Sequence, residues 1–373
     1  MKKMALLINL LIIHTATTAQ FNPNGYCKVP VADLIGSPIK EFFKQNLSTQ
    51  ELYNQIPLDD RNGIPTCPRM TQLLYNDPVE ILEYRNNEVK IYMPQWVYRA
   101  KEKNYGTYWT FSSNIAPLTP DSKKYHPNNI PFKTENQTII VLDKPFYNKK
   151  TKETYSIGTR FVLASHKKSS NQPTFKVLYT KHTHKKTVDI PKTDAHIEQL
   201  HNSTEARTLF VDLLRSWVNP NQDPIPYLFG GNSWTGYENT KDTCPLTGFD
   251  CGKIITVAAQ FSGIPLYASN SLTLKESCKS LKKNDTLENG DLIYFTGHIA
   301  VISDIKKGLL IEARGYKSGY GFIQEIPFSE QFKDINTTQD LLDAYFNKTK
   351  VIRYEKDHSK TQKIQGIILL KLC

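Results

Sequence analysis

Apolar and polar positions alternate in short runs through the first half of the chain, and this period of two predicts β-strands separated by turns. The clearest runs lie at residues 71–84, 88–92 and 105–111. Short strands at this spacing are typical of a small barrel. We therefore expect a first barrel within residues 61–125.

A second set of alternating runs predicts another small barrel within residues 126–195. Its strands are expected at 137–142, 159–164 and 175–179. Ahead of both barrels, two short helical patterns at 39–47 and 49–55 indicate a helical clip that spans residues 20–60.

Longer apolar patterns replace the alternating runs in the second half of the chain. Apolar residues at helical spacing predict a helix from Thr204, its capping residue, to Trp217. A second, buried helix is expected through residues 254–261, ended by Ser262-Gly263. A turn and a short strand at 288–295 then lead into a hairpin, whose two strands are expected at 298–302 and 309–313.

Cys251 directly precedes the predicted buried helix and follows a turn-rich run, Thr247 to Asp250. The positive end of a helix stabilises a thiolate, so this position is expected to lower the pKa of the thiol from roughly 8.5 toward neutrality. A nucleophilic cysteine is therefore one interpretation. A small buried hydrophobic residue is the more usual role for a lone cysteine, and Asp250 can simply cap the helix.

His298 opens the first strand of the predicted hairpin, and Glu312 lies in the second strand. The hairpin can bring the Glu312 carboxylate beside the imidazole, where it would accept the Nδ1–H and hold the ring in one tautomer. The alternatives are a core histidine bonded to a backbone carbonyl and an outward-facing glutamate.

Four motifs in this region resemble the successive motifs of the NlpC/P60 cysteine peptidases. They are Tyr227-Leu228-Phe229-Gly230-Gly231, Asp250-Cys251, Gly290-Asp291-Leu292-Ile293-Tyr294-Phe295 and Gly297-His298-Ile299-Ala300-Val301. In this order they span residues 227–301. The resemblance implies a papain-like α+β domain at 200–373, which hydrolyses bacterial cell-wall stem peptides between γ-D-glutamate and a diamino acid.

The same resemblance implies roles for individual residues. Cys251 takes the place of the nucleophile, His298 that of the base, and Glu312 the third, ring-orienting position. Tyr227 falls where the family places a tyrosine near the oxyanion, although it can equally be a packing aromatic. Asp250 would accept the free amine of the first L-Ala of the stem peptide.

The chain departs from the family pattern at three places. Where the family usually reads Asp-Cys-Ser-Gly, Gly252 follows the cysteine and supplies no hydroxyl for the substrate. Glu312 stands where His, Asn or Gln is common. About a dozen extra residues between Gly231 and Cys251, among them Trp234, are expected to form a loop beside the site.

The predicted barrels resemble the bacterial SH3 domains that precede the catalytic domain in a subset of this family. The complete expectation is thus a papain-like catalytic domain preceded by two small SH3-like β-barrels. Such a barrel either binds wall polymer or walls off one end of the cleft, restricting substrates to those with a free N-terminal L-Ala. Tyr105 and Tyr108 would contact substrate in the second case, and are otherwise core aromatics.

Length and composition agree with a globular protein of two or three domains, because 39% of the 373 residues are hydrophobic and 22% are charged. The N-terminal residues 1–19 combine lysines, an apolar run and small residues, which predicts a signal peptide cleaved after Ala19. The mature protein is then secreted or periplasmic. No later apolar run is long enough to span a membrane, so no stable membrane insertion is expected after cleavage.

The formal charge of +11 falls to about +9 without Lys2 and Lys3, and a basic surface suits an anionic wall polymer. Because the lysines are scattered and no nucleic-acid motif accompanies them, we expect no nucleic-acid partner. No Cys-x-x-Cys or His-Glu-x-x-His spacing occurs, so neither a metal nor another cofactor is expected. We expect the protein to be a monomer. Location alone suggests bridges of Cys27 with Cys67 and of Cys244 with Cys278.

Two other function classes remain open on these residues. One is a non-catalytic wall-binding protein on the same scaffold. The other is a secreted thiol enzyme with a different substrate, such as an amidase, a transglutaminase-like enzyme or an effector that acts on host protein.

Overall fold

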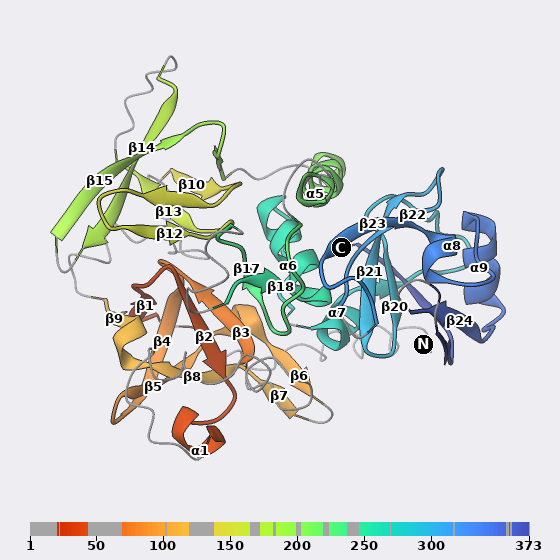
Figure 1. The fold of residues 1–373 in the computed structure, drawn as a ribbon, viewed down its shortest axis with the longest axis horizontal. Helices are drawn as coiled ribbons and strands as arrows, with labels where there is room; N and C mark the ends of the chain where they lie inside the picture. Colours follow the sequence, from red (N-terminus) through yellow and green to blue (C-terminus); the bar gives the residue numbers. More distant parts are fainter. Residues whose placement is uncertain are drawn as a thin grey trace, which may run out of the picture.

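Antiparallel sheets carry most of the fold in this computed structural model (Figure 1). The structure describes residues 21, 23–43, 69–100, 103–118, 138–164, 172–181, 184–198, 203–218, 224–236, 246–268, 270–315, 318–355, 358 and 360–372. The predicted signal peptide lies outside them. Among these residues, no helix is long and apolar enough to cross a membrane.

A seven-stranded sheet forms the first part of the chain, in the order β3-β2-β8-β5-β4-β1-β9. Its strands are β1 (Gly25–Cys27), β2 (Val31–Ile35), β3 (Arg69–Leu74), β4 (Pro78–Arg85), β5 (Glu88–Tyr92), β8 (Thr107–Phe111) and β9 (Ile115–Pro117). The 3-10 turns η1 (Pro94–Trp96) and η2 (Ser112–Asn114) and the hairpin of β6 (Tyr98–Ala100) and β7 (Lys103–Tyr105) connect them. Asn76, with φ 72°, makes the turn that divides the expected run at 71–84 into two strands.

The expected helical clip at 20–60 is only partly helical where it is described. A five-residue helix, α1 (Ile39–Phe43), occurs as expected, but residues 25–35 instead give β1 and β2 to the seven-stranded sheet. All five residues of β2 are buried, including Asp33, so neither alternation nor an apolar run marks this strand in the sequence.

A five-stranded sheet follows, in the order β15-β14-β13-β10-β16. Its strands are β10 (Ile139–Leu142), β13 (Arg160–Leu163), β14 (Thr174–Lys181), β15 (His184–Pro191) and β16 (Ala195–Ile197), with a separate hairpin of β11 (Phe146–Asn148) and β12 (Glu153–Tyr155). Tyr75 directly follows β3 of the first sheet and packs into the core of this five-stranded sheet, where its ring centroid lies 4.9 Å from that of Tyr155. The first two sheets therefore share a buried contact.

A six-stranded antiparallel sheet, in the order β19-β26-β20-β21-β22-β23, forms the C-terminal part. Its strands are β19 (Lys279–Ser280), β20 (Leu292–Phe295), β21 (His298–Asp304), β22 (Leu309–Ala313), β23 (Ile323–Pro327) and β26 (Ile368–Lys371). The predicted hairpin of residues 298–302 and 309–313 is confirmed by the pairing of β21 with β22.

Helices and short strands surround this sheet. They are α5 (Ser203–Trp217), α6 (Cys251–Phe261), α7 (Ser271–Ser277), α8 (Phe328–Gln331), α9 (Thr338–Phe346), and the strand pairs β17 (Asn232–Ser233) with β18 (Gly248–Phe249) and β24 (Val351–Tyr354) with β25 (Thr361–Ile364). The two long helices match the predicted ones at their C-terminal ends. Helix α5 begins at Ser203, so the expected cap Thr204 lies inside it, and α6 begins at Cys251, three residues before the expected start at 254.

Helix α6 lies at the centre of the molecule, between the N-terminal sheets and the six-stranded sheet (Figure 1). One apolar core runs through all three parts, from Leu73 in β3 through Ile254 in α6 to Val301 in β21. Burial of shared apolar surface is the main source of association free energy. The seven-stranded sheet is therefore packed against the helix that begins at Cys251.

The cysteine pairing suggested by location is wrong for Cys27. Its thiol is free and buried in β1, and its sulfur lies 3.3 Å from the Val29 carbonyl oxygen, to which it donates. Cys67 and Cys244 lie outside the described residues.

Candidate active site

The turn before α6 fixes Cys251 as the first residue of that helix. Asp250 caps the helix: its Oδ1 accepts the backbone N–H groups of Gly252 at 2.9 Å and Lys253 at 2.7 Å. Its Oδ2 accepts the N–H of Gly230 at 3.0 Å. A side-chain cap of this kind stabilises a helix start by about 1 kcal/mol. The capping role considered for Asp250 is therefore present, and its burial raises the pKa of this carboxyl.

The thiol of Cys251 differs electrostatically from the expectation based on the helix dipole alone. Burial raises the pKa of the Cys251 thiol above its ordinary value, and the negative charges of Asp250 and Glu312 act in the same direction. Backbone hydrogen bonds from Ile299 and Gly252 oppose them only in part. The expected lowering toward neutrality is thus wrong for this arrangement, because helix position was visible in the sequence and burial was not. The raised pKa favours the neutral form of the thiol, so a base would have to take its proton before it could act as a nucleophile.

His298 lies in the strand that contacts the Cys251 sulfur. It is the first residue of β21, and the next residue, Ile299, hydrogen-bonds the Cys251 sulfur through its backbone. The imidazole is 5% exposed, and its Nε2 atom lies 2.7 Å from Oε2 of Glu312 in the neighbouring strand β22. The sequence predicted this pair but assigned the bond to Nδ1. With Nε2 engaged by the carboxylate, Nδ1 is the ring nitrogen left for the reaction.

Glu312 is 1% exposed and is held by several partners besides His298. Its Oε1 accepts from Gln324 Nε2 at 3.1 Å and lies 3.5 Å from the guanidinium of Arg314. Burial acts to raise the pKa of Glu312, but the hydrogen bond and charge of His298, the charge of Arg314 and the bond from Gln324 outweigh it, so its pKa lies below the ordinary value. The carboxylate beside the imidazole is therefore ionised.

Arg314 and Gln324 were not singled out in the sequence. Arg314 is 4% exposed and donates to Gln331 Oε1 at 2.7 Å and to the Tyr354 carbonyl at 2.6 Å. A signal for it was available, because Arg314 directly follows the strand of Glu312 and residues two apart in extended backbone share a face. Gln324 lies opposite Glu312 in β23, a pairing that only the sheet register reveals.

The backbone of Tyr227 forms an isolated parallel β-bridge with Phe249, two residues before the first residue of α6. Its side chain is half-buried, and its ring packs against Gly315, where a Cβ would meet it at 3.2 Å. Gly252 is equally confined, because a Cβ there would lie 2.9 Å from the carbonyl carbon of Asn270 and 3.1 Å from the nitrogen of Ser271. The backbone at 270–271 thus occupies the space that a serine side chain at 252 would need.

The expected substrate contact of the two tyrosines of the first barrel is not supported for Tyr108. Tyr108 is 0% exposed in β8, and its hydroxyl donates to the carbonyl of Trp96. Tyr108 is therefore a core aromatic residue, which was the alternative interpretation to a substrate contact. The backbone of Tyr105 lies in β7, paired with Tyr98.

The loop expected between Gly231 and Cys251 is described at its two ends. Trp234 is 6% exposed, and its backbone N–H donates to Oγ of Ser156, the residue after β12, at 2.8 Å. Within the described parts of the chain, no group of three or more His, Cys, Asp or Glu side chains is placed to hold a metal ion.

No protein-family model matches the chain, and neither does any curated protein. Among solved structures, it is similar to an NlpC/P60 family protein from Bacillus cereus, with a TM-score of 0.57 and 16% identity over 82% of this chain and 94% of the other. A lesser similarity, with a TM-score of 0.24 and 21% identity over 34% of this chain and 62% of the other, relates it to the peptidoglycan hydrolase RipB of Mycobacterium tuberculosis. Cys251, His298 and Glu312 thus lie in a chain that has the fold of an NlpC/P60 family protein.

Proposed function

We propose that the protein is a cysteine peptidase that cleaves peptidoglycan stem peptides between γ-D-glutamate and the diamino acid. The observation that carries this proposal is the convergence of three groups from different elements. Cys251 begins α6, the backbone of Ile299 in β21 hydrogen-bonds its sulfur, and His298 is bonded at 2.7 Å to Glu312 in β22. Nucleophile, base and a group that orients the base form the arrangement that thiol catalysis uses.

In the proposed reaction His298 removes the thiol proton as Cys251 attacks the γ-glutamyl carbonyl carbon. The imidazolium then gives that proton to the leaving amine of the diamino acid, and a thioester remains. Water attacks the thioester while His298 takes one of its protons, which releases the carboxylate and restores the thiol. The ionised Glu312 stabilises the imidazolium at each stage.

The helix start supplies the group that faces the oxyanion. Asp250 already accepts the N–H groups of Gly252 and Lys253, so the N–H of Cys251 is the donor left in the first turn for the developing charge. Tyr227, next to Phe249, is the proposed second donor through its hydroxyl.

The substrate is a stem peptide with a free N-terminal L-Ala, whose ammonium pairs with Asp250. Asp250 already accepts hydrogen bonds from three backbone N–H groups. A carboxylate offers about four acceptor positions, so one is left for the ammonium of the substrate. We also propose that the N-terminal sheets are SH3-like, that they limit the cleft, and that the protein acts as an exported monomer.

Incubation with L-Ala-γ-D-Glu-diaminopimelate peptides tests the proposal. We expect release of the L-Ala-γ-D-Glu dipeptide, loss of this activity in Cys251→Ala, and retention of it in Cys27→Ala, which removes a free thiol of the seven-stranded sheet. Cleavage that persists in Cys251→Ala, or a wild type that leaves the peptide intact, would contradict it. Peptides N-acetylated on L-Ala test the Asp250 contact and should be cleaved more slowly.

A further inference from the structure

Two buried cations cross the boundary between the seven-stranded sheet and the start of α6, in opposite directions. Lys253 extends from α6 into the sheet, and Arg69 extends from β3 of the sheet to the carbonyl of Phe229, whose neighbour Gly230 donates to the α6 cap Asp250. Lys253 is 0% exposed and Arg69 is 1% exposed. Removing an ion from water costs several kcal/mol even after relaxation, so two such groups at one boundary need a physical reason.

Lys253 is the third residue of α6, two positions after the nucleophile. Its Nζ donates to Oγ1 of Thr71 in β3 at 2.7 Å and lies 4.0 Å from the centroid of the Trp96 ring. Trp96 is in turn held by Tyr108, whose hydroxyl donates to its carbonyl. A positive charge in the first turn opposes the helix dipole. The charge of Asp250 offsets the cost of burying this lysine only in part. The helix start alone therefore does not account for Lys253, whereas contact with the sheet does.

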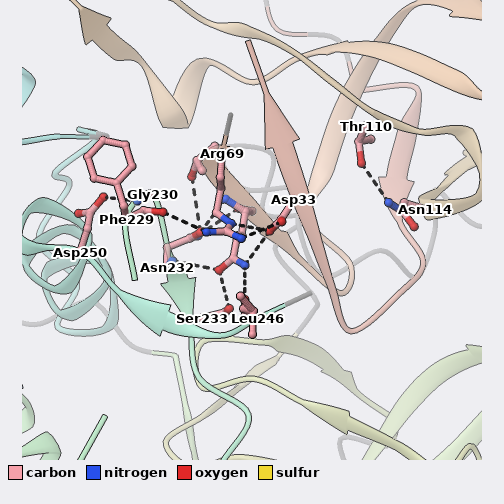
Figure 2. Close-up of polar contacts among 12 residues, drawn as sticks. Asp33, Arg69, Thr110, Asn114, Phe229, Gly230, Asn232, Ser233, Leu246 and Asp250 are labelled. Carbon is pink, nitrogen blue, oxygen red and sulfur yellow. Dashed lines mark hydrogen bonds and ion pairs between the residues drawn. The ribbon is translucent and has the colours of Figure 1, made fainter. Parts of the chain in front are cut away.

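Arg69 makes the reciprocal contact (Figure 2). Its guanidinium forms two bonds with Asp33, at 2.8 and 3.1 Å, and donates to the Phe229 carbonyl at 3.2 Å. The adjacent Gly230, with φ 68°, has no room for a Cβ, which would lie 2.6 Å from the Arg69 carbonyl oxygen. Gly230 then donates to Asp250, the cap of α6. Hydrogen bonds therefore link the sheet to the residue just before the nucleophile.

Neutral contacts already dock the sheet on the catalytic part, independently of the two cations. The side chain of Asn232 in β17 pairs with the backbone of Gln72 like a neighbouring strand: Oδ1 accepts the Gln72 N–H at 2.8 Å and Nδ2 donates to its carbonyl at 3.1 Å. Ser233 donates to Gln72 Oε1 at 2.6 Å. The Lys253 contact is thus not needed to hold the parts together, and its place next to the nucleophile distinguishes it.

We infer that Lys253 is a positioning residue: its amino group, bonded to Thr71 and packed on Trp96, sets the place of the first turn of α6 and so aims Cys251 at its base and substrate. This inference rests on the proposed thiol chemistry at Cys251. The seven-stranded sheet is accordingly part of the catalytic unit. Cys251 lies between two residues that are each tied to the sheet, Asp250 through Gly230 and Arg69, and Lys253 directly.

Thr71 gives the sharpest test, because it lies in the sheet, remote in sequence from the nucleophile, and has two close substitutes. Thr71→Val keeps the shape and removes the oxygen, while Thr71→Ser keeps the oxygen. A displaced nucleophile costs up to about 100-fold in rate, so we expect Thr71→Val to lower kcat about tenfold with KM nearly unchanged. Thr71→Ser should stay within about twofold of wild type.

The rate of Cys251 alkylation by iodoacetamide, followed by peptide mass mapping between about pH 5 and 10, supplies a readout that needs no substrate. We expect the alkylation rate to fall in Thr71→Val and in Lys253→Met, and to be unchanged in Thr71→Ser. Lys192→Met is the matched control: Lys192 lies 5.6 Å from the Phe175 ring in the second sheet, far along the chain from α6.

Limited proteolysis of each variant checks that the sheet remains docked. Wild-type alkylation and kcat in a docked Thr71→Val variant would overturn the inference, as would an equal loss in Thr71→Val and Thr71→Ser. A wild type that leaves stem peptides intact would refute the proposed substrate alone, because the alkylation comparison would still decide the role of Lys253.

Discussion

Nε2 of His298 and Oε2 of Glu312 lie 2.7 Å apart, and the carboxylate is 1% exposed. A buried ionised carboxylate at this distance holds the ring in one orientation. Because the bond uses Nε2, the opposite ring nitrogen is the one available to exchange a proton with the thiol. Because burial raises the pKa of the Cys251 thiol, the proposed reaction couples this proton exchange to the attack.

Glu312→Gln is expected to lower kcat by about 10- to 100-fold with little change in KM, because the neutral amide no longer stabilises the imidazolium that forms during attack. Steady-state kinetics on the stem peptide measures the effect. Glu325→Gln is the control, since it removes a carboxylate of the next strand that pairs with Arg215 instead. An equal loss in both variants would indicate a general electrostatic or folding effect.

Arg314→Met should destabilise the fold by about 3–5 kcal/mol, because it leaves the Glu312 carboxylate buried with a weaker counter-charge. Combining it with Glu312→Gln removes the stranded charge, so the double variant should regain part of the lost stability. Urea unfolding of the single and double variants measures the coupling. Strictly additive losses would show that the two side chains do not act as a pair.

Gly252→Ser introduces the residue usual in the resembled family and is nevertheless expected to destabilise this chain by about 1–3 kcal/mol. The new Cβ would meet backbone atoms of Asn270 and Ser271 at 2.9–3.1 Å, and backbone cannot move aside as a side chain can. Thermal unfolding measures the loss. Gly106→Ser should cost less, since its Cβ would meet only the edge of the Tyr92 ring, at 3.1 Å. A Gly252→Ser variant as stable as wild type would mean that the 270–271 backbone shifts freely.

Local patterns in the sequence were enough to predict α6 and the hairpin of β21 and β22. Helical periodicity, the Ser262-Gly263 stop and alternation on the strands are all short-range signals. The same hairpin register predicted that Glu312 would lie beside His298, although the ring nitrogen involved depends on how the imidazole packs.

Features that depend on contacts far apart in the chain could not be predicted in this way. Strand β2 contains Asp33, a charge that is acceptable inside a sheet only because Arg69, 36 residues later, neutralises it. The burial of Lys253 likewise has no local signal, because it depends on Thr71 and Trp96 in the seven-stranded part of the chain. The raised thiol pKa of Cys251 has the same origin, since burial is a property of the assembled core.

Stability should depend on pH through Lys253, whose pKa is lowered by burial from 10.5 to about 7, with the charge of Asp250 opposing the shift in part. Between these two values the unfolded chain binds a proton that the folded chain does not, so the stability of wild type should rise as pH increases. The Lys253→Met variant lacks this contribution. The stability of wild type relative to Lys253→Met is therefore expected to increase by about 2 kcal/mol from pH 7 to pH 9. Urea unfolding at both pH values measures it, with Lys192→Met as a control whose difference from wild type should not change. A difference between wild type and Lys253→Met that is constant or shrinks over this range would show that the buried amine keeps its proton in the folded state.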